Sequence, residues 1–137
     1  MKIAICSSLT FAKEMVEVKR DLEKLGHNAV YSEFTEKFIG KSDNEKEKMN
    51  AENFAAHDVI RAFWKKIKKC DAILVLNYNK KGIKNYIGGN TLMEIGFAHV
   101  LNKKIYLVND IPDISYYKAE IIGVNPIILK GDFKKIN

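Results

Sequence analysis

The sequence predicts an α/β fold, a single domain over residues 1–137 with a doubly wound, five-stranded parallel sheet. Apolar runs of strand length alternate with stretches of helical periodicity along the whole chain, in the order βαβαβαβαβ. Its 137 residues, 47% hydrophobic and 29% charged, have the size and composition of one globular domain. Such alternation places helices on both faces of a parallel sheet.

The expected strands are short and rich in apolar residues. Residues 2–6 form a continuous apolar run, which suits a strand buried on both faces. The strongest run begins at Asp71 and ends at Asn77, and Pro126 suits the first residue of an edge strand. The five predicted strands are 2–6, 28–31, 71–77, 104–109 and 126–129.

The expected helices lie between these runs. Thr10 opens a helix with apolar residues at helical spacing, and Gly26 is its stop signal. One long helical stretch is expected over 42–69, with a polar and exposed first half. A helix is expected to begin at Asn90 or Thr91 and to end at Leu101, and a short one over 113–122.

Charge and composition exclude several classes of protein. The net charge is +6, but only Arg20 and Arg61 among the 23 basic residues are arginines, and lysines are spread among 17 acids. Nucleic-acid binding is therefore not expected. Two lysine clusters, residues 65–69 and 80–84, are either solvated faces or a positive field near an anionic ligand.

Location and metal binding are also constrained. The chain has no apolar run of membrane-spanning length and no signal peptide, so we expect a cytoplasmic protein without a membrane partner. Cys6 and Cys70 have no metal-ligand spacing and are expected as buried free thiols at opposite ends of the sheet. Neither a Gly-x-Gly-x-x-Gly fingerprint nor a Walker lysine loop is present, so no metal and no cofactor is expected.

Ligands of such sheets bind beyond the carboxyl ends of the strands. Three polar or glycine-rich loops are expected there, after the first, third and fourth strands. Ser7 and Ser8 either bind a ligand or cap the following helix. Asn77 opens the second of these loops.

The segment from Ile87 to Glu94 is the most informative part of the chain. Gly88 and Gly89 let the backbone approach a ligand closely, and Asn90 or Thr91 is expected to cap the helix. Glu94 then falls near the first turn, where the helix dipole favours an ionised carboxylate. It is either a nucleophile or an ordinary helix-stabilising glutamate.

Four matching segments resemble the nucleoside 2-deoxyribosyltransferase superfamily, which includes the 2′-deoxynucleoside 5′-phosphate N-hydrolases. They are residues 3–8 with Phe11, residues 70–76 beginning Cys-Asp-Ala, residues 89–98 (Gly-Asn-Thr-Leu-Met-Glu-Ile-Gly-Phe-Ala) and residues 102–107. They span most of the chain in the family's order. Together with the alternating pattern, the resemblance implies the flavodoxin-like, Rossmann-like strand order 2-1-3-4-5.

The resemblance also implies a chemistry and a partner. Glu94 would form a glycosyl ester at C1′ of a deoxynucleoside or its 5′-monophosphate, and the base would leave. Asp71 would match a ligand-site residue, or it is only a strand-start residue. Sites in this family are commonly completed by a neighbouring subunit. A homodimer or higher homo-oligomer is therefore expected, with Phe54, Phe63 and Trp64 as an apolar surface.

Two departures from the family keep a second function class open. No acid lies between Asp71 and Glu94, where residues 80–84 instead contribute lysines, and Asn90 is inserted between Gly89 and Thr91. The first departure weakens base exchange and favours an anionic ligand. The alternatives are an N-glycosidic enzyme and a catalytically silent nucleotide-binding or sensing module.

Histidines and aromatic residues are expected to have structural roles. No sequence pattern around the three histidines, His27, His57 and His99, indicates a catalytic role. The aromatic residues of the helical stretches are expected in the core rather than as a base-stacking platform.

Overall fold

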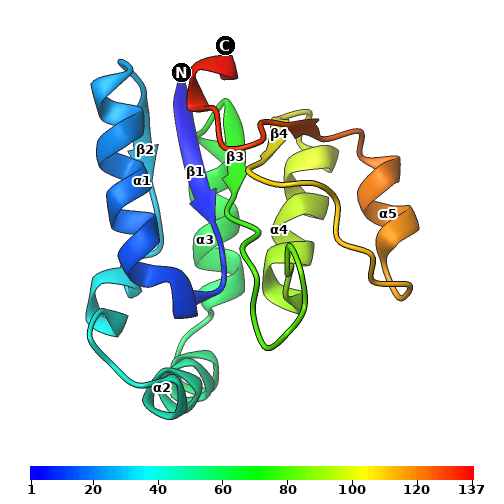
Figure 1. Cartoon of the computed structure of the whole chain (residues 1–137). Coiled ribbons are helices and arrows are strands. Elements are labelled where there is room, and N and C mark those ends of the chain that lie inside the picture. Colours follow the sequence, from blue (N-terminus) through cyan, green and yellow to red (C-terminus); the bar gives the residue numbers. More distant parts are fainter.

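The computed structural model describes residues 1–137, and its five strands form one sheet in which every neighbouring pair is parallel. The strand order is β2-β1-β3-β4-β5, so the flavodoxin-like prediction is confirmed (Figure 1). The order reverses between β1 and β3, and the loops after these two strands flank the crevice where such sheets bind ligands. The strands are β1 (Lys2–Cys6), β2 (Asn28–Val30), β3 (Ala72–Val75), β4 (Lys104–Leu107) and β5 (Ile127–Ile128).

Helices cover both faces of the sheet. The helix α1 and the C-terminal 3-10 helix η3 lie on one face, and α3, α4 and α5 lie on the other (Figure 1). None of the helices is both long enough and apolar enough to cross a membrane. The helices are η1 (Leu9–Phe11), α1 (Ala12–Lys24), η2 (Thr35–Phe38), α2 (Asp43–Ala56), α3 (Val59–Lys68), α4 (Gly89–Val100), α5 (Lys118–Gly123) and η3 (Phe133–Lys135).

The alternation of side chains along the strands divides the core into two halves. In β1, Ile3 and Ile5 pack with α1, while Ala4 and Cys6 pack with α3 and α4. All four side chains are buried, as expected for a strand covered on both faces.

The long helical stretch predicted over 42–69 is two helices, which corrects that expectation. His57 has an extended backbone, and the Asp58 carboxylate accepts a hydrogen bond from Arg61 N–H at 3.1 Å, which caps α3. A side-chain cap ends one helix and starts the next, although helical periodicity continues through it. The first helix, α2, has a capping box between Ser42 and Glu45 and no buried residue, in agreement with the predicted exposed first half.

Other boundaries differ by a few residues. Thr10, which was expected to open the first helix, lies in η1 instead, α4 begins at Gly89, and α5 begins only at Lys118. No side chain caps α4, so neither Asn90 nor Thr91 is its cap, because Gly88 occupies that position.

The exposed edge of the sheet is protected by lysines. The Lys19 amine donates to the Ala29 carbonyl at 2.8 Å, and the Lys66 amine donates to the Tyr31 carbonyl at 3.0 Å. These carbonyls belong to or follow β2 and have no strand beyond them. Lysines from α1 and α3 that occupy these carbonyls oppose the addition of another strand at this edge.

Both cysteines are buried and free, as predicted. Cys6 lies at the carboxyl end of β1, in register with Val75, whereas Cys70 precedes the amino end of β3.

Candidate functional site

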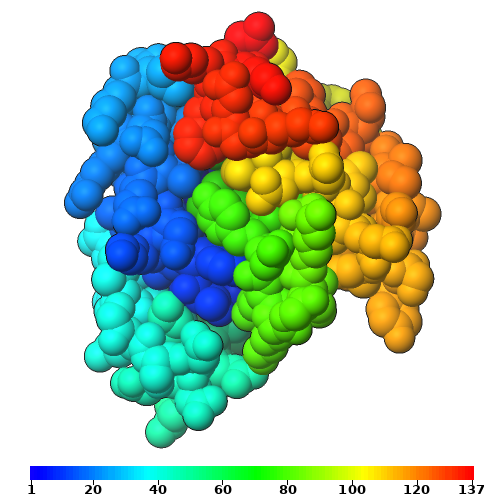
Figure 2. Space-filling view, viewed as in Figure 1, coloured from blue at the N-terminus to red at the C-terminus, as the bar shows by residue number.

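A cavity of about 740 Å³ opens at the carboxyl edge of the sheet. Its wall consists of the loop after β1, the loop after β3, the first turns of α4, one face of α2 and the start of α3. In Figure 2 the green loop after β3, the blue N-terminal segment and the cyan segment before and within α2 meet on this side of the molecule. This is the edge at which a doubly wound sheet binds ligands.

Most of the residues predicted for the ligand site lie in this wall. They come from the segment after β1 and from the start of α4: Ser7, Ser8, Phe11, Gly88, Gly89, Asn90, Thr91 and Glu94. The structure thus brings the loop after β1 and the glycine-containing segment to one cavity, although about eighty residues separate them in the sequence.

Asp71 lies at the other edge of the sheet, away from the cavity. It precedes β3, is exposed, and accepts a hydrogen bond from the Lys2 backbone N–H at 2.7 Å. The register of Ala72 with Ile3 confirms that this is the amino end of the strands. The expectation of Asp71 at the ligand site is therefore corrected: it joins the starts of two strands.

Asn77 is buried but contributes no wall to the cavity. The side-chain NH2 of Asn77 donates to the backbone carbonyls of Asn109 and Asp110 at 3.0 Å each. Its side-chain oxygen Oδ1 accepts from the backbone N–H of Asn109 at 2.9 Å. The side chain therefore connects the loops after β3 and β4, and it is not available to a ligand.

Glu94 is a buried acid in the wall of the cavity. It is only 6% exposed and lies in the second turn of α4, too far along the helix for a strong dipole effect. Burial raises its pKa from 4.5 to about 8. The expectation that the helix keeps this carboxylate ionised near pH 7 is therefore wrong, because desolvation outweighs the helix dipole.

Cys6 is the neighbour of Glu94 at the floor of the cavity. The polar thiol beside the carboxyl lowers the pKa of Glu94, but by less than burial raises it. Burial, followed by the charge of Glu94, raises the pKa of the Cys6 thiol well above its usual range. The thiol is thus neutral rather than a nucleophile, and it donates to the Ala4 carbonyl at 3.8 Å.

The first turn of α4 presents backbone to the cavity. Gly88 and Gly89 line the cavity, and α4 has no side-chain cap, so its first N–H groups are available to a ligand. A Cβ at Gly88 would lie 3.2 Å from the Tyr86 hydroxyl oxygen, whereas a Cβ at Gly89 would meet nothing within 4 Å. The close approach at Gly88 is therefore to Tyr86, and Gly89 faces open space.

A tight hairpin carries two lysines to the rim. Lys80 and Ile83 exchange backbone hydrogen bonds of 3.0 and 2.9 Å, and Lys81 and Gly82 both have positive φ, as a type I′ turn requires. The Lys80 amine donates to Ser8 Oγ at 2.8 Å and lies 5.1 Å from the centre of the Tyr86 ring.

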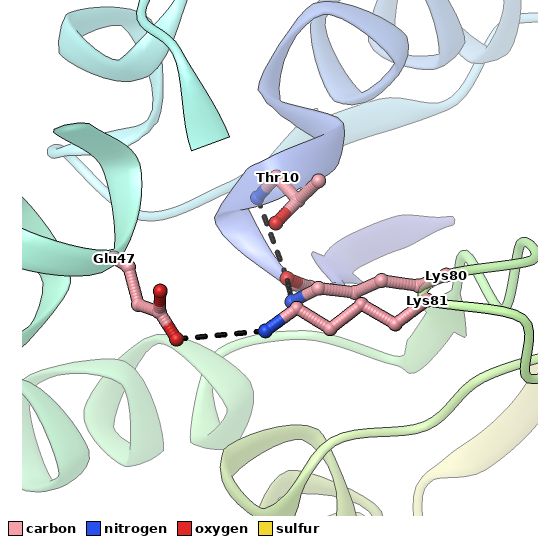
Figure 3. Close-up of polar contacts among 5 residues, drawn as sticks. Thr10, Glu47, Lys80 and Lys81 are labelled. Carbon is pink, nitrogen blue, oxygen red and sulfur yellow. Dashed lines mark hydrogen bonds and ion pairs between the residues drawn. The ribbon is translucent and has the colours of Figure 1, made fainter. Parts of the chain in front are cut away.

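The charges at this rim are only partly compensated. The Lys81 amine lies 3.5 Å from the carboxylate of Glu47 on α2 (Figure 3). The Lys80 amine, which donates to Ser8, has no carboxylate within 4 Å. Burial, together with the neighbouring Lys81, lowers the pKa of Lys80. The rim is thus a place where an anion would be favoured.

The two serines have different roles. Ser8 accepts a hydrogen bond from Thr10 N–H at 3.4 Å and caps η1, while also receiving the Lys80 amine. Ser7 donates to the Leu76 carbonyl at 3.0 Å and joins the ends of β1 and β3. Both hydroxyls lie in the cavity wall, and the capping alternative holds for Ser8.

Sequence reasoning missed the wall made by α2 and the segment before it. Lys46, Asn50 and Asn53 line the cavity, and so do Phe34 and Tyr86. The polarity of α2 could have indicated an unusual helix, but nothing in the sequence showed what it faces.

Two aromatic residues expected in the core or in an oligomer surface also belong to the cavity. Phe63 is buried and Phe54 is 37% exposed, and both contribute to the wall. The expected apolar surface on this stretch is therefore smaller than predicted.

The fold and the cavity define a flavodoxin-like α/β protein with a largely polar cavity at its strand switch point. No protein-family model matches the chain, and no curated protein matches it. Among solved structures, a similar one is that of Clostridium botulinum CMP N-glycosidase, BcmB, with a TM-score of 0.51 and 17% sequence identity. The match covers 93% of this chain and 85% of that chain. At this identity the likeness shows a shared fold.

Proposed function

We propose that this chain cleaves or transfers the N-glycosidic bond of a deoxynucleoside or deoxynucleoside 5′-monophosphate, with Glu94 as the nucleophile. The observation that carries the proposal is a single buried carboxyl in the wall of a cavity that also holds Lys80, an amine with no carboxylate within 4 Å. The fold shared with a CMP N-glycosidase supports it, as does the resemblance of the Gly-Asn-Thr-Leu-Met-Glu segment to deoxyribosyltransferases.

The chemistry follows the two-step course of retaining glycoside cleavage. The Glu94 carboxylate attacks C1′, the bond from C1′ to the base nitrogen breaks, and the base leaves with the electron pair and takes up a proton. Water or a second base then attacks C1′ and releases the carboxylate. A poorly hydrated carboxylate is a strong nucleophile and also stabilises positive charge developing at C1′.

The raised pKa limits how much of the free protein is ready to react. With a pKa of about 8, about a tenth of the Glu94 side chains are ionised at pH 7. This same observation favours the second candidate, a nucleotide-binding or sensing module, because a protonated carboxyl binds a sugar hydroxyl without attacking it.

Base release separates the two candidates. Wild-type protein, Glu94→Ala and Glu94→Gln are incubated with the common deoxynucleosides and their monophosphates, and free base is measured by chromatography. The enzyme proposal expects release by wild type and a loss of several orders of magnitude in both variants, with the fold checked by circular dichroism. Equal release by wild type and variants would remove Glu94 from the mechanism. Binding without release by wild type would establish the binding module instead.

A 5′-phosphate is expected to contact Lys80, the part-buried amine at the rim that no carboxylate neutralises. Lys80→Ala should weaken binding of monophosphates about tenfold or more and leave binding of nucleosides unchanged. Lys84→Ala is the matched control, because Lys84 is exposed in the same loop and lies outside the cavity wall. Equal effects of the two substitutions would argue against a phosphate contact at Lys80.

A further inference from the structure

The helix α2 has an arrangement that packing does not explain. None of its residues is buried, and it contains few large apolar side chains. A helix that packs against a protein normally turns an apolar stripe inward. The residues of α2 that line the cavity instead recur at helical spacing and are mostly polar: Asp43, Asn44, Lys46, Glu47, Asn50, Asn53 and Phe54.

The cavity-lining residues of α2 form a polar stripe, and the first half of this α2 stripe makes contacts with the rest of the protein. The Lys46 amine donates to the Thr10 carbonyl at 2.9 Å, and Glu47 pairs with Lys81, as Figure 3 shows for the latter pair. Glu45 completes the capping box with Ser42. These contacts hold the start of α2 against η1 and the lysine hairpin.

The second half of the stripe carries amides and an aromatic ring. Asn53 is half-buried, Asn50 is exposed, and both lie in the cavity wall beside Phe54. Phe34, which lies in the segment before α2, also lines the cavity. Its ring centre lies 5.5 Å from the centre of the His57 ring. An amide supplies a donor and an acceptor on one side chain, which matches the edge of a nucleobase, and aromatic rings suit its face.

The distance between the two halves of the α2 stripe sets the length of ligand that could contact both. From Glu47 to Phe54 the helix rises about 10 Å. A ligand with its anionic group at Lys80 and Lys81 would therefore extend along α2 toward the amides, within the same cavity that Glu94 lines.

We infer that the second half of the α2 stripe reads the base of the ligand, with Asn53 as the specificity-determining side chain and Phe54 against the face of the base. The inference rests on the proposed function, because it names the part of the same cavity that selects the substrate. Recognition by one amide discriminates between bases according to their exocyclic amino and keto groups.

Calorimetric binding tests this inference with the full chain. The probes are the four common deoxynucleoside 5′-monophosphates, with 2-deoxyribose 5-phosphate as a ligand that lacks a base. The variants are Asn53→Leu and Asn53→Asp. The control is Glu52→Gln, because Glu52 is the adjacent residue of the same helix and is not part of the cavity wall.

The expected result has two parts. Asn53→Leu should weaken the best-bound nucleotide about tenfold or more, and leave the affinity for 2-deoxyribose 5-phosphate unchanged. Asn53→Asp removes the donor and keeps acceptors, so it should shift the preference toward adenine, cytosine and guanine, which carry exocyclic amino groups, and away from thymine, which has none. Glu52→Gln should change neither property.

Three outcomes would overturn the inference. One is an unchanged base preference in both Asn53 variants, and another is an equal loss of affinity for 2-deoxyribose 5-phosphate. The third is a wild-type protein that binds none of the nucleotides, which would also remove the proposed function. If wild type binds nucleotides and never releases base, only the glycosidase proposal fails, and the binding data still decide the role of Asn53.

Discussion

Replacing Glu94 with glutamine should make the folded protein more stable at neutral pH, with a gain that grows as the pH rises. The native pKa of about 8 lies above the ordinary value of 4.5, so the folded chain holds a proton that the unfolded chain loses. The stability that comes with this proton is fully present below pH 4.5 and is lost as the pH rises through 8. Glutamine keeps the shape and hydrogen-bonding capacity without any titration.

The size of the effect follows from the burial of this side chain. Each pH unit between the unfolded and the folded pKa changes the free energy of unfolding by about 1.4 kcal/mol. The 2.5 pH units from 4.5 to 7 therefore amount to about 3 kcal/mol. Such a value is a large part of the stability of an ordinary domain. Cys6 adds no dependence over this range, because burial raises the pKa of its thiol well above it.

Urea denaturation at pH 5, 6, 7 and 8, at constant ionic strength, measures this difference. The free energy of unfolding of Glu94→Gln minus that of wild type should increase by about 1.4 kcal/mol per pH unit and level off above pH 8. Glu45→Gln is the control, because hydrogen bonds from Ser42 lower the pKa of Glu45 and leave it ionised throughout this range. A Glu94→Gln difference that stays constant with pH would show that water reaches this carboxyl, and the reasoning from burial would fail.

Other measurements check the site and the assembly. If ionised Glu94 is the nucleophile, kcat/KM should rise about tenfold per pH unit below pH 8 and then level, and a fall over that range would instead indicate an acid. Gly88→Ala should lower Tm, because its methyl group would crowd Tyr86, whereas Gly89→Ala should leave Tm unchanged or raise it; the reverse order would contradict the described contacts. Asp71→Asn should not change nucleotide affinity, since Asp71 lies at the amino edge of the sheet, and a marked loss would return it to the site. Sedimentation at micromolar concentration should find a homodimer or larger, and monomer alone would refute the expected oligomer.

Local patterns were sufficient for the α/β class and the parallel sheet, whereas the strand order was predicted from these patterns together with the family resemblance. The buried run from Lys2 to Cys6 and the helical spacing after it each report on a few neighbouring residues, and the parallel order follows once these elements alternate. The carboxyl ends of parallel strands share one edge, so the loop at Ser7 and Ser8 and the segment ending at Glu94 could be placed together from the sequence.

Boundaries and caps were less predictable, because competing local signals are close in energy. Helical periodicity runs through His57 and Asp58, yet a side-chain cap at Asp58 starts a new helix. Asn90 and Thr91 are good capping residues, but Gly88 takes that position because the chain enters the helix earlier.

The sequence by itself determined the fold class, the strand order and the edge of the sheet where a ligand site would lie. Only the tertiary structure decided which polar residues reach that site. Asp71 and Asn77 are used to join strands and loops, while Lys80 and Asn53 reach the cavity from segments without a recognisable motif. The protonation of Glu94 was decided in the same way. A pKa depends on how much water surrounding segments exclude, and that exclusion exists only after they have packed together.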